Sequence, residues 1–285
     1  MEIRSLGLTS NPNKKDGPMV ARACLQICAE LGIRAVVDER LSQSLPGVCE
    51  AVSATPARGV DALVVLGGDG TILRAVPDAA LADIPILGVN LGRVGFLAEV
   101  EPEQLREALT ELCAGRYRAE HRMMLEILIE GHESIYALNE VVLSRGTCAR
   151  MVGFDAYVGG TLVDHYIADG LVLSAPTGST AYSLSAGGPI VSPDVSCFIL
   201  SPICPHSLQS RPIVLSDKEI VTLGINAGEP REGMAVCVDG QRTYAVHNHE
   251  CIRIRRAGRD ARFIRFQSER NFFTLLRSKL SQWSL

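Results

Sequence analysis

Lysine and aromatic residues are scarce in this chain of 285 residues. Phe, Trp and Tyr together make up 5% of it, and no lysine stands in the Gly-Lys-Ser/Thr setting of a P-loop, which excludes that class of phosphate site. The formal net charge is -4, so there is no electrostatic reason to expect binding to nucleic acid or to an acidic membrane. The only lysines are Lys14, Lys15, Lys218 and Lys279.

Cysteine spacing and apolar patterning remove further classes of protein. The nine cysteines include no Cys-x-x-Cys pair, which argues against a structural zinc site and against a redox dithiol. The first ten residues lack the basic start and apolar stretch of a secretory signal, and no apolar run approaches membrane-spanning length. We therefore expect a cytoplasmic protein with reduced thiols.

The length and the patterning predict an α/β domain followed by an all-β domain. With 47% hydrophobic and 21% charged residues, the composition is that of a folded soluble protein large enough for two cores. Residues 1–118 alternate short apolar runs with helical spacing, which is typical of a mostly parallel sheet covered by helices. Strands are expected there at 3–8, 33–37, 62–66 and 84–89, and helices include a weaker one at 44–54.

Short alternating segments then dominate, and they predict a β-rich, sandwich-like domain over 119–267. The last segment, 268–285, contains apolar residues at helical spacing. Because a lone helix needs an apolar surface to cover, we expect it to pack back on the first domain. The expected strands of the β domain are 124–129, 135–144, 154–158, 171–174, 197–200, 220–225, 234–238 and 252–256.

The turn Gly67-Gly68-Asp69-Gly70-Thr71 lies between a buried strand and an expected helix. Its glycines leave backbone N–H groups uncovered, so a phosphate can approach closely. Because a carboxylate repels phosphate, Asp69 must face a hydroxyl or sit near a metal or basic group. Leu73 stands where a dinucleotide-binding fingerprint needs a third small residue. The turn therefore indicates a kinase, with a structural Gly-rich turn as the alternative.

Three further stretches carry chemistry. Phe96, between two glycines, either lines a ligand pocket or plugs the core. Asn139-Glu140 interrupts an apolar strand, and such a pair serves either a structural hydrogen-bond network or the recognition of a base and a ribose. The stretch 169–189 is dense in hydroxyls and small residues, and it offers Tyr182 for stacking on a base. A plain Pro-Gly-Ser turn is the alternative there, but the length and density favour a binding site.

Five motifs taken together resemble the NAD kinases in order and spacing. The resemblance covers nearly the whole chain, from the first strand to the segment 276–280. The first motif alone also resembles turns of lipid kinases and phosphofructokinases, whereas the set is highly specific. The motifs are 67–71, 139–140, 174–182 with 187–188, 202–208 and 238–240.

The resemblance implies a role for each matching residue. Asp69 would be the general base that accepts the proton of the adenosine 2′-hydroxyl of NAD as it attacks the γ-phosphoryl group of ATP, which makes NADP. Phe96 would lie in the pocket, Asn139 would contact the adenine, and Glu140 the ribose. The donor phosphates would meet Gly67, Gly68, Gly70, Thr71 and, more weakly, Arg74. The adenosine wall would be Thr177, Thr180, Ala181, Tyr182 and Ser185, and the nicotinamide end would meet Asp169, with His206 and Asp239 as fainter candidates.

The resemblance also implies partners, and one departure from the family pattern bears on specificity. A homodimer or homotetramer is expected, and Mg²⁺ would arrive with ATP, since no dedicated metal cage is visible. Polyphosphate is an alternative donor, and a lipid kinase or a non-enzymatic NADP sensor are alternative functions. Ile167 stands where relatives often place an arginine, which puts the discrimination between NAD and NADH in doubt. His165, close by, could partly replace that charge.

Overall fold

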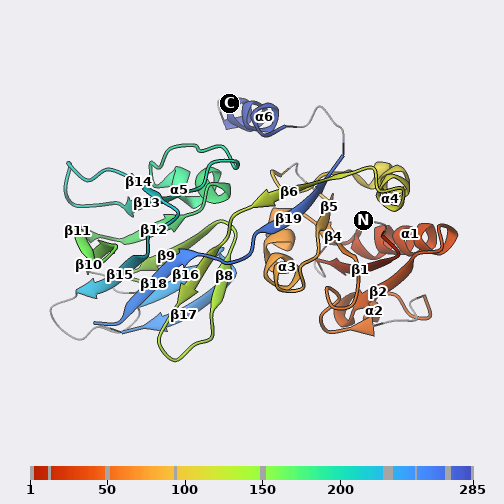
Figure 1. The fold of residues 1–285 in the computed structure, drawn as a ribbon, viewed down its shortest axis with the longest axis horizontal. Helices are drawn as coiled ribbons and strands as arrows, with labels where there is room; N and C mark the ends of the chain where they lie inside the picture. The colour runs from red at the N-terminus through yellow and green to blue at the C-terminus, as the bar shows by residue number, and fades with distance from the viewer. Residues whose placement is uncertain are drawn as a thin grey trace. The chain divides into compact units, whose positions relative to one another are not determined.

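The computed structural model describes residues 3–11, 14–48, 52–92, 95–147, 152–226, 234–247, 249–266 and 271–283. The chain divides into two compact units, Met1–His121 with Ala261–Leu285, and Arg122–Asp260. Figure 1 shows each unit as a ribbon. Within the described residues, no helix is both long and apolar enough to cross a membrane.

The first unit is built on a seven-stranded sheet in the order β3-β2-β1-β4-β5-β19-β6. The neighbours from β3 to β19 pair in parallel, as expected of a sheet made from alternating strands and helices. β4 is buried along its whole length. The strands are β1 (Ser5–Ser10), β2 (Arg34–Asp38), β3 (Val52–Ser53), β4 (Ala62–Gly67), β5 (Ile86–Asn90), β6 (Arg118–Arg122) and β19 (Ala261–Arg265).

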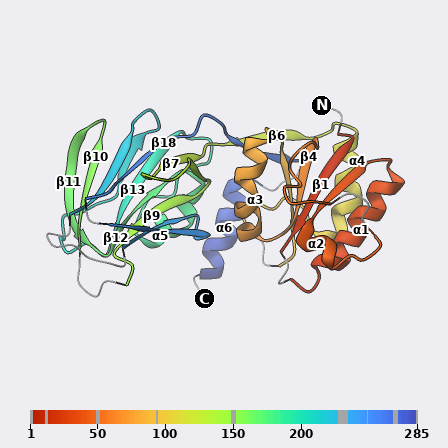
Figure 2. The same cartoon turned by 90° about the horizontal axis from the view of Figure 1, so that it is seen from below.

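Helices cover both faces of this sheet. α1 (Gly17–Glu30) and α4 (Leu105–Cys113) pack together on one face, and α3 (Asp69–Leu81) contacts β4, β5 and β19 on the other, as Figure 2 shows. The apolar residues of α1 recur at helical spacing, so one stripe of that helix is buried in the core. A short helix, α2 (Glu39–Gln43), follows β2, and a 3₁₀ turn, η1 (Pro102–Gln104), precedes α4. The expected helix at 44–54 does not form in the described residues, because α2 ends at Gln43 and β3 begins at Val52.

The second unit is a sandwich of two six-stranded sheets, β11-β10-β15-β18-β7-β8 and β14-β13-β12-β9-β16-β17, in which neighbouring strands pair antiparallel. Side chains of both sheets form one core, in which Phe154 of β10 and Phe198 of β13 are fully buried. The β-sandwich-like prediction is therefore confirmed. The strands are β7 (Leu125–Leu128), β8 (Ile135–Ala137), β9 (Glu140–Ser144), β10 (Val152–Val158), β11 (Thr161–Ala168), β12 (Gly170–Ser174), β13 (Cys197–Ile203), β14 (Ile213–Ser216), β15 (Val221–Asn226), β16 (Met234–Val238), β17 (Arg242–Val246) and β18 (Cys251–Arg256).

The expected strand 135–144 is in fact two strands. β8 ends at Ala137 in one sheet and β9 begins at Glu140 in the other, so the chain crosses between the layers at Leu138-Asn139. Apolar residues flank Asn139-Glu140 on both sides, as 136–138 and 141–143, and the sequence pattern therefore reads as one strand.

The chain returns to the first sheet earlier than the expected boundary at residue 267. β19 lies between β5 and β6, which places residues from 261 onward in the first unit. The final helix, α6 (Phe272–Trp283), belongs to the same unit, and the ring of its Phe272 lies 6.0 Å from that of Phe96. The expected final helix is thus present.

Candidate active site

The Gly-rich turn links β4 to α3. Gly68 caps α3 in an extended conformation, and Asp69 is the first residue of the helix. A Cβ added at Gly67 would overlap the side chain of the buried Thr71, so packing within the chain requires glycine there. A Cβ at Gly68 would meet nothing within 4 Å, and its φ of -98° suits any residue. Nothing within the unit therefore requires glycine at position 68. A ligand that comes close to the backbone there would require it.

The second glycine turn holds the Asp69 carboxylate. The backbone N–H of Phe96 donates to Oδ2 at 2.8 Å, and that of Leu97 donates to Oδ1 at 3.1 Å. A Cβ at Gly95 would overlap the same carboxylate. From the sequence, Phe96 was expected either to line a ligand pocket or to fill the core. Neither interpretation predicts that its backbone N–H binds Asp69. The contact orients Asp69 and still leaves lone pairs on both of its oxygens.

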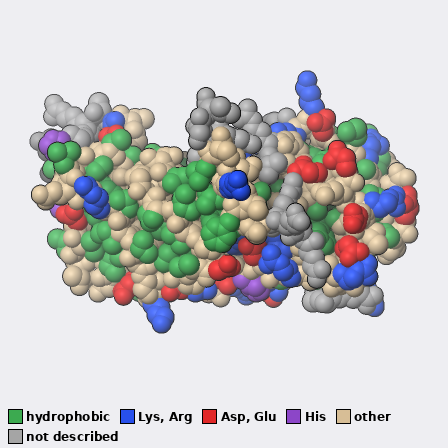
Figure 3. Space-filling model, turned by 90° about the horizontal axis from the view of Figure 1, so that it is seen from above, with side chains coloured by type: hydrophobic (Ala, Val, Ile, Leu, Met, Phe, Trp, Pro, Cys, Tyr) green, Lys and Arg blue, Asp and Glu red, His purple; other side chains and the backbone are tan. Residues whose placement is uncertain are grey.

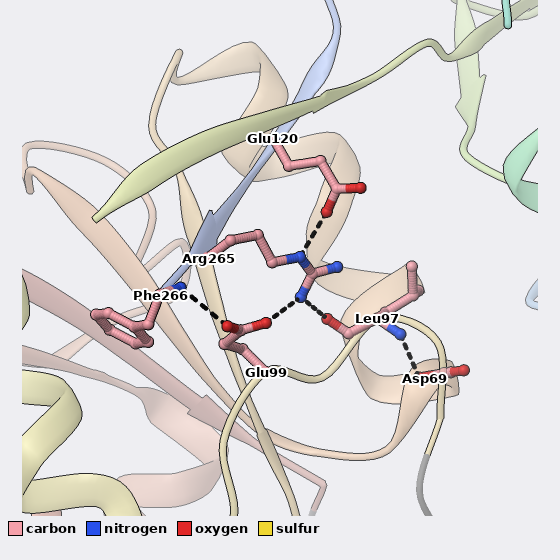
Figure 4. A network of polar contacts seen from close by, with 6 residues as sticks. All are labelled: Asp69, Leu97, Glu99, Glu120, Arg265 and Phe266. Carbon is pink, nitrogen blue, oxygen red and sulfur yellow. Dashed lines mark hydrogen bonds and ion pairs between the residues drawn. The ribbon is translucent and has the colours of Figure 1, made fainter. Parts of the chain in front are cut away.

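An ion-pair network lies behind this turn, as Figure 4 shows. The Arg265 guanidinium donates to the Leu97 carbonyl at 2.9 Å and pairs with Glu99 at 3.1 Å and with Glu120. Glu99 also accepts the Phe266 N–H at 2.9 Å. Leu97 therefore joins Arg265, through its carbonyl, to Asp69, through its N–H. Burial raises the pKa of Glu99 even though Arg265 lies beside it.

Sequence reasoning missed Arg265 as a site residue. It lies on β19, in a segment assigned to the other domain, and no nearby motif marks it. Of the other residues predicted for the donor phosphates, Gly70 and Arg74 are both exposed, on the first turns of α3.

In the second unit, Asp239 holds the crossing between β8 and β9. It lies in the β16–β17 turn with a φ of 49°, and its carboxylate accepts the N–H groups of Leu138 at 2.8 Å, Asn139 at 2.8 Å and Glu140 at 3.0 Å. Asp239 was expected near the nicotinamide end. The structure places it at the Asn139-Glu140 turn, where its role is to fix the backbone.

Glu140 is a buried acid beside Asp239. It is 7% exposed, and its Oε2 has no hydrogen-bond partner among the described residues. Burial, and secondarily the Asp239 charge, raise the pKa of Glu140 to about 8. Burial also raises the pKa of Asp239, although three N–H groups oppose that shift. An unpartnered carboxyl oxygen at this turn is a group ready to bind a ligand hydroxyl.

The hydroxyl-rich stretch packs directly onto Asn139. The Ala175 N–H donates to the Asn139 carbonyl at 2.8 Å, and a Cβ at Gly178 would overlap the Asn139 backbone. The stretch continues as η2 (Thr177–Thr180) and α5 (Tyr182–Ser185), with Tyr182 43% exposed. Thr177 is buried and Ser185 exposed, while Thr180 and Ala181 are half-buried. The structure thus brings the predicted adenosine wall to the Asn139-Glu140 turn.

A separate cluster surrounds Asp169 at the other end of β12. Arg145 pairs with the Asp169 carboxylate at 2.7 Å, and the His206 N–H donates to the Ile167 carbonyl at 2.8 Å. His165 is not part of this cluster, because its ring nitrogen Nδ1 lies 2.6 Å from Asp155. Arg145 was missed because it is far from Asp169 in the sequence, and the sequence does not tell that β9 and β12 are neighbours.

Comparison with known proteins decides the family. Residues 6–117 match the model of the ATP-NAD kinase N-terminal domain, and residues 138–266 match that of the ATP-NAD kinase C-terminal domain.

The chain belongs to the NAD kinase family.

Individual members of the NAD kinase family are similar over most of the chain. The NAD kinase of Moorella thermoacetica is 40% identical over 286 residues, covering 98% of this chain and 90% of that protein. The NAD kinase of Heliobacterium modesticaldum is 47% identical over 229 residues, covering 79% and 80%. The resemblance found in the five motifs is therefore confirmed.

Solved NAD kinase structures share the fold. Yeast NADH kinase, crystallised with NADH, superposes with a TM-score of 0.88 at 25% identity, covering 99% of this chain and 88% of that one. An NAD kinase from Archaeoglobus fulgidus, in complex with ATP, gives a TM-score of 0.74 at 29% identity, covering 96% and 99%. The predicted fold class, an α/β unit followed by a β unit and a final helix, is confirmed.

Proposed function

We propose that the enzyme transfers the γ-phosphoryl group of ATP to the 2′-hydroxyl of the adenosine ribose of NAD, with Asp69 as the general base. The 2′-oxygen forms a bond to the γ-phosphorus, the bond from that phosphorus to the bridging oxygen breaks, ADP leaves, and the hydroxyl proton passes to Asp69. The observation that carries this role is the double N–H contact from Phe96 and Leu97, which fixes the carboxylate. Phosphoryl transfer through a loose transition state depends mainly on such positioning.

The acceptor is proposed to bind along β12 in the second unit. Glu140, opposite Ser174 at one end of that strand, and Asn139 would take the adenosine, and Asp169, just before the other end, would take the nicotinamide. Five strand residues separate the two ends by about 17 Å at ~3.3 Å each. That spacing suits the two ends of an extended dinucleotide.

Arg145 is proposed to supply the cation that Ile167 lacks. It pairs with Asp169 from β9, so the charge at the nicotinamide end comes from another strand. Within the family, one solved structure is of an NADH kinase with NADH and another of an NAD kinase with ATP. A cation beside the nicotinamide disfavours the positively charged ring of NAD relative to the neutral ring of NADH.

Mg²⁺ is proposed to enter with ATP and to neutralise its phosphates. No group of three His, Cys, Asp or Glu side chains able to hold a metal occurs in the described part of the chain.

A homo-oligomer is also proposed. Figure 3 shows hydrophobic side chains gathered on the left of one face, over the second unit. The exposed large apolar residues of that unit include Leu162, Val163, Ile167, Val195, Leu208 and Val214. Gathered apolar side chains of this kind mark association surfaces. The cytoplasmic location stays a prediction.

The decisive experiment is to incubate the purified chain with Mg-ATP and either NAD or NADH and to measure NADP(H). Product from either acceptor supports the kinase. Binding of NADP without product from ATP or polyphosphate would make the chain a sensor. Product from polyphosphate alone would correct the donor.

A further inference from the structure

We propose that Lys14, in the turn after β1, is the cation that binds the phosphate chain of the donor. This inference rests on the proposed kinase function and adds a residue and a turn to its donor side. The Gly-rich turn after β4 supplies backbone N–H groups but no positive side chain of its own before Arg74, whereas a triphosphate carries several negative charges.

The sheet order identifies where a ligand binds. From β1 the chain proceeds to β2 and β3 on one side, and from β4 it proceeds to β5 on the other. β1 and β4 are parallel neighbours, so the order of the strands reverses between them, and their carboxyl ends lie side by side with Ser10 opposite Leu66. In open parallel sheets, ligands bind outside the carboxyl ends of the strands at this reversal. The turn after β1 is therefore as much a part of this edge as the turn after β4.

Two buried polar atoms at this edge have no hydrogen-bond partner among the described residues. One is Ser10 Oγ, at the end of β1, and the other is Asn90 Oδ1, at the end of β5. Asn90 is 2% exposed and lies opposite Gly67, while its Nδ2 donates to the Gly92 carbonyl and to Glu101. Buried polar groups are almost always satisfied, so two exceptions at the ends of β1 and β5, the strands on either side of β4, indicate a ligand or its solvent. The Ser10 hydroxyl can donate to a phosphate, whereas the Asn90 oxygen accepts only and is satisfied by a water molecule or a ligand hydroxyl.

Lys14 reaches the same edge. Its Nζ would lie 2.9 Å from a Cβ added at Gly92, which places the ammonium over the turn that follows Asn90. No carboxylate in the described part of the chain pairs with it. The turn that carries Lys14 is tied to the end of β4, because the Asn11 N–H donates to the Leu66 carbonyl at 3.2 Å and the Lys14 N–H donates to the Asn11 carbonyl at 3.1 Å.

Gly68 completes the arrangement. Its position is open, with nothing within 4 Å of an added Cβ, so the edge has room for a phosphate against the backbone. A lysine, a serine hydroxyl and the backbone N–H groups at the start of α3 are all donors, which is the chemistry that a phosphate chain requires. ATP and inorganic polyphosphate share that chain, and the experiment separates them.

The test compares Lys14→Gln with Lys15→Gln, since the two lysines are adjacent and exposed. KM for Mg-ATP, KM for NAD and kcat are measured for each, together with the binding of inorganic tripolyphosphate by calorimetry. Loss of one charge-assisted contact is expected to raise KM for Mg-ATP about tenfold and to weaken tripolyphosphate binding by a similar factor. KM for NAD stays within about twofold, and Lys15→Gln matches the wild type.

Two further variants sharpen the result. Lys14→Arg keeps the charge and is expected to recover most of the donor affinity. Gly68→Ala is expected to fold with an unchanged melting temperature and to bind tripolyphosphate weakly, because its methyl group occupies the space of a phosphate. Repeating KM with polyphosphate tells whether Lys14 serves one donor or both.

Either of two results would overturn the proposal. One is a Lys14→Gln enzyme whose donor KM and tripolyphosphate affinity equal those of the wild type. The other is a rise in KM for NAD that keeps step with KM for Mg-ATP. Failure of the kinase assay in the wild type is a separate outcome, because tripolyphosphate binding and its dependence on Lys14 are measured without turnover.

Discussion

Each unit has an Asp-Gly turn whose carboxylate accepts backbone N–H groups, but the two carboxylates differ in burial and in the number of these contacts. Asp69 and Asp239 both precede a glycine, and both accept backbone N–H groups from a segment distant in sequence. Asp239 is 7% exposed and takes three N–H groups, whereas Asp69 is partly exposed and takes two. A buried carboxylate that accepts three backbone N–H groups holds a fold together, and a partly exposed one with an open lone pair on each oxygen can also contact a substrate.

The largest effect is expected from Asp69→Asn. The amide keeps the shape but cannot accept the hydroxyl proton, so kcat should fall about 10²–10⁴-fold. One N–H contact is lost as well, because an amide offers a single oxygen, and this costs about 1 kcal/mol of stability. Steady-state rates and thermal melting measure the two effects, and near-normal kcat would remove Asp69 as the base.

Asp239→Ala should show the opposite pattern to Asp69→Asn, with a large loss of stability and a smaller effect on kcat. Three N–H groups, two of them buried, would lose their acceptor, which is expected to lower the free energy of unfolding by about 2–4 kcal/mol. KM for NAD should rise because the Asn139-Glu140 turn is no longer fixed, while KM for ATP should change little. Urea unfolding checks the stability, and a large loss of kcat in a protein of normal stability would contradict the comparison.

Stability should depend on pH through Glu140. Its pKa is raised from 4.5 to about 8 in the folded protein, so the folded state binds the proton more tightly than the unfolded chain does. The resulting stabilisation is present below about pH 4.5 and is lost as the pH rises towards 8, by a few kcal/mol.

Glu140→Gln tests this dependence, because it removes the charge and keeps the shape. The urea midpoint of the wild type should fall between pH 5.5 and 8.5, and that of Glu140→Gln should fall less. Equal slopes in the two proteins would show that another group titrates.

The smallest effect is expected from Arg145→Gln. It leaves Asp169 with an uncompensated negative charge, which favours the positively charged nicotinamide of NAD over the neutral one of NADH. The ratio of kcat/KM for NAD to that for NADH should rise about three- to tenfold. Arg255→Gln, which breaks the Arg255–Glu126 pair of the same unit, is the matched control. A ratio that moves equally in both variants would exclude a specific role for Arg145.

Short sequence patterns correctly predicted the features that depend on neighbouring residues. The Gly-rich turn after a buried strand, the two classes of sheet and the final helix all follow from short stretches of sequence. The Asn139-Glu140 turn was expected inside one strand, because apolar residues on both sides of it do not tell that β8 and β9 lie in different sheets. Arg265 and the backbone role of Asp239 were missed, because each acts on residues about a hundred or more positions away. The site residues themselves stay predictions until the variants are measured.

Because β19 belongs to the first sheet, the sequence of the second unit is inserted between two parts of the first unit. β6 and β19 are neighbours in one sheet, and residues 122–260 leave from one and return by the other. During synthesis the first sheet therefore cannot be completed until the second unit has been made, since β19 and Arg265 leave the ribosome after it. A transcript that ends after residue 122 would encode a sheet that lacks an inner strand, whereas replacing 123–260 by a short linker between β6 and β19 would keep every strand of that sheet.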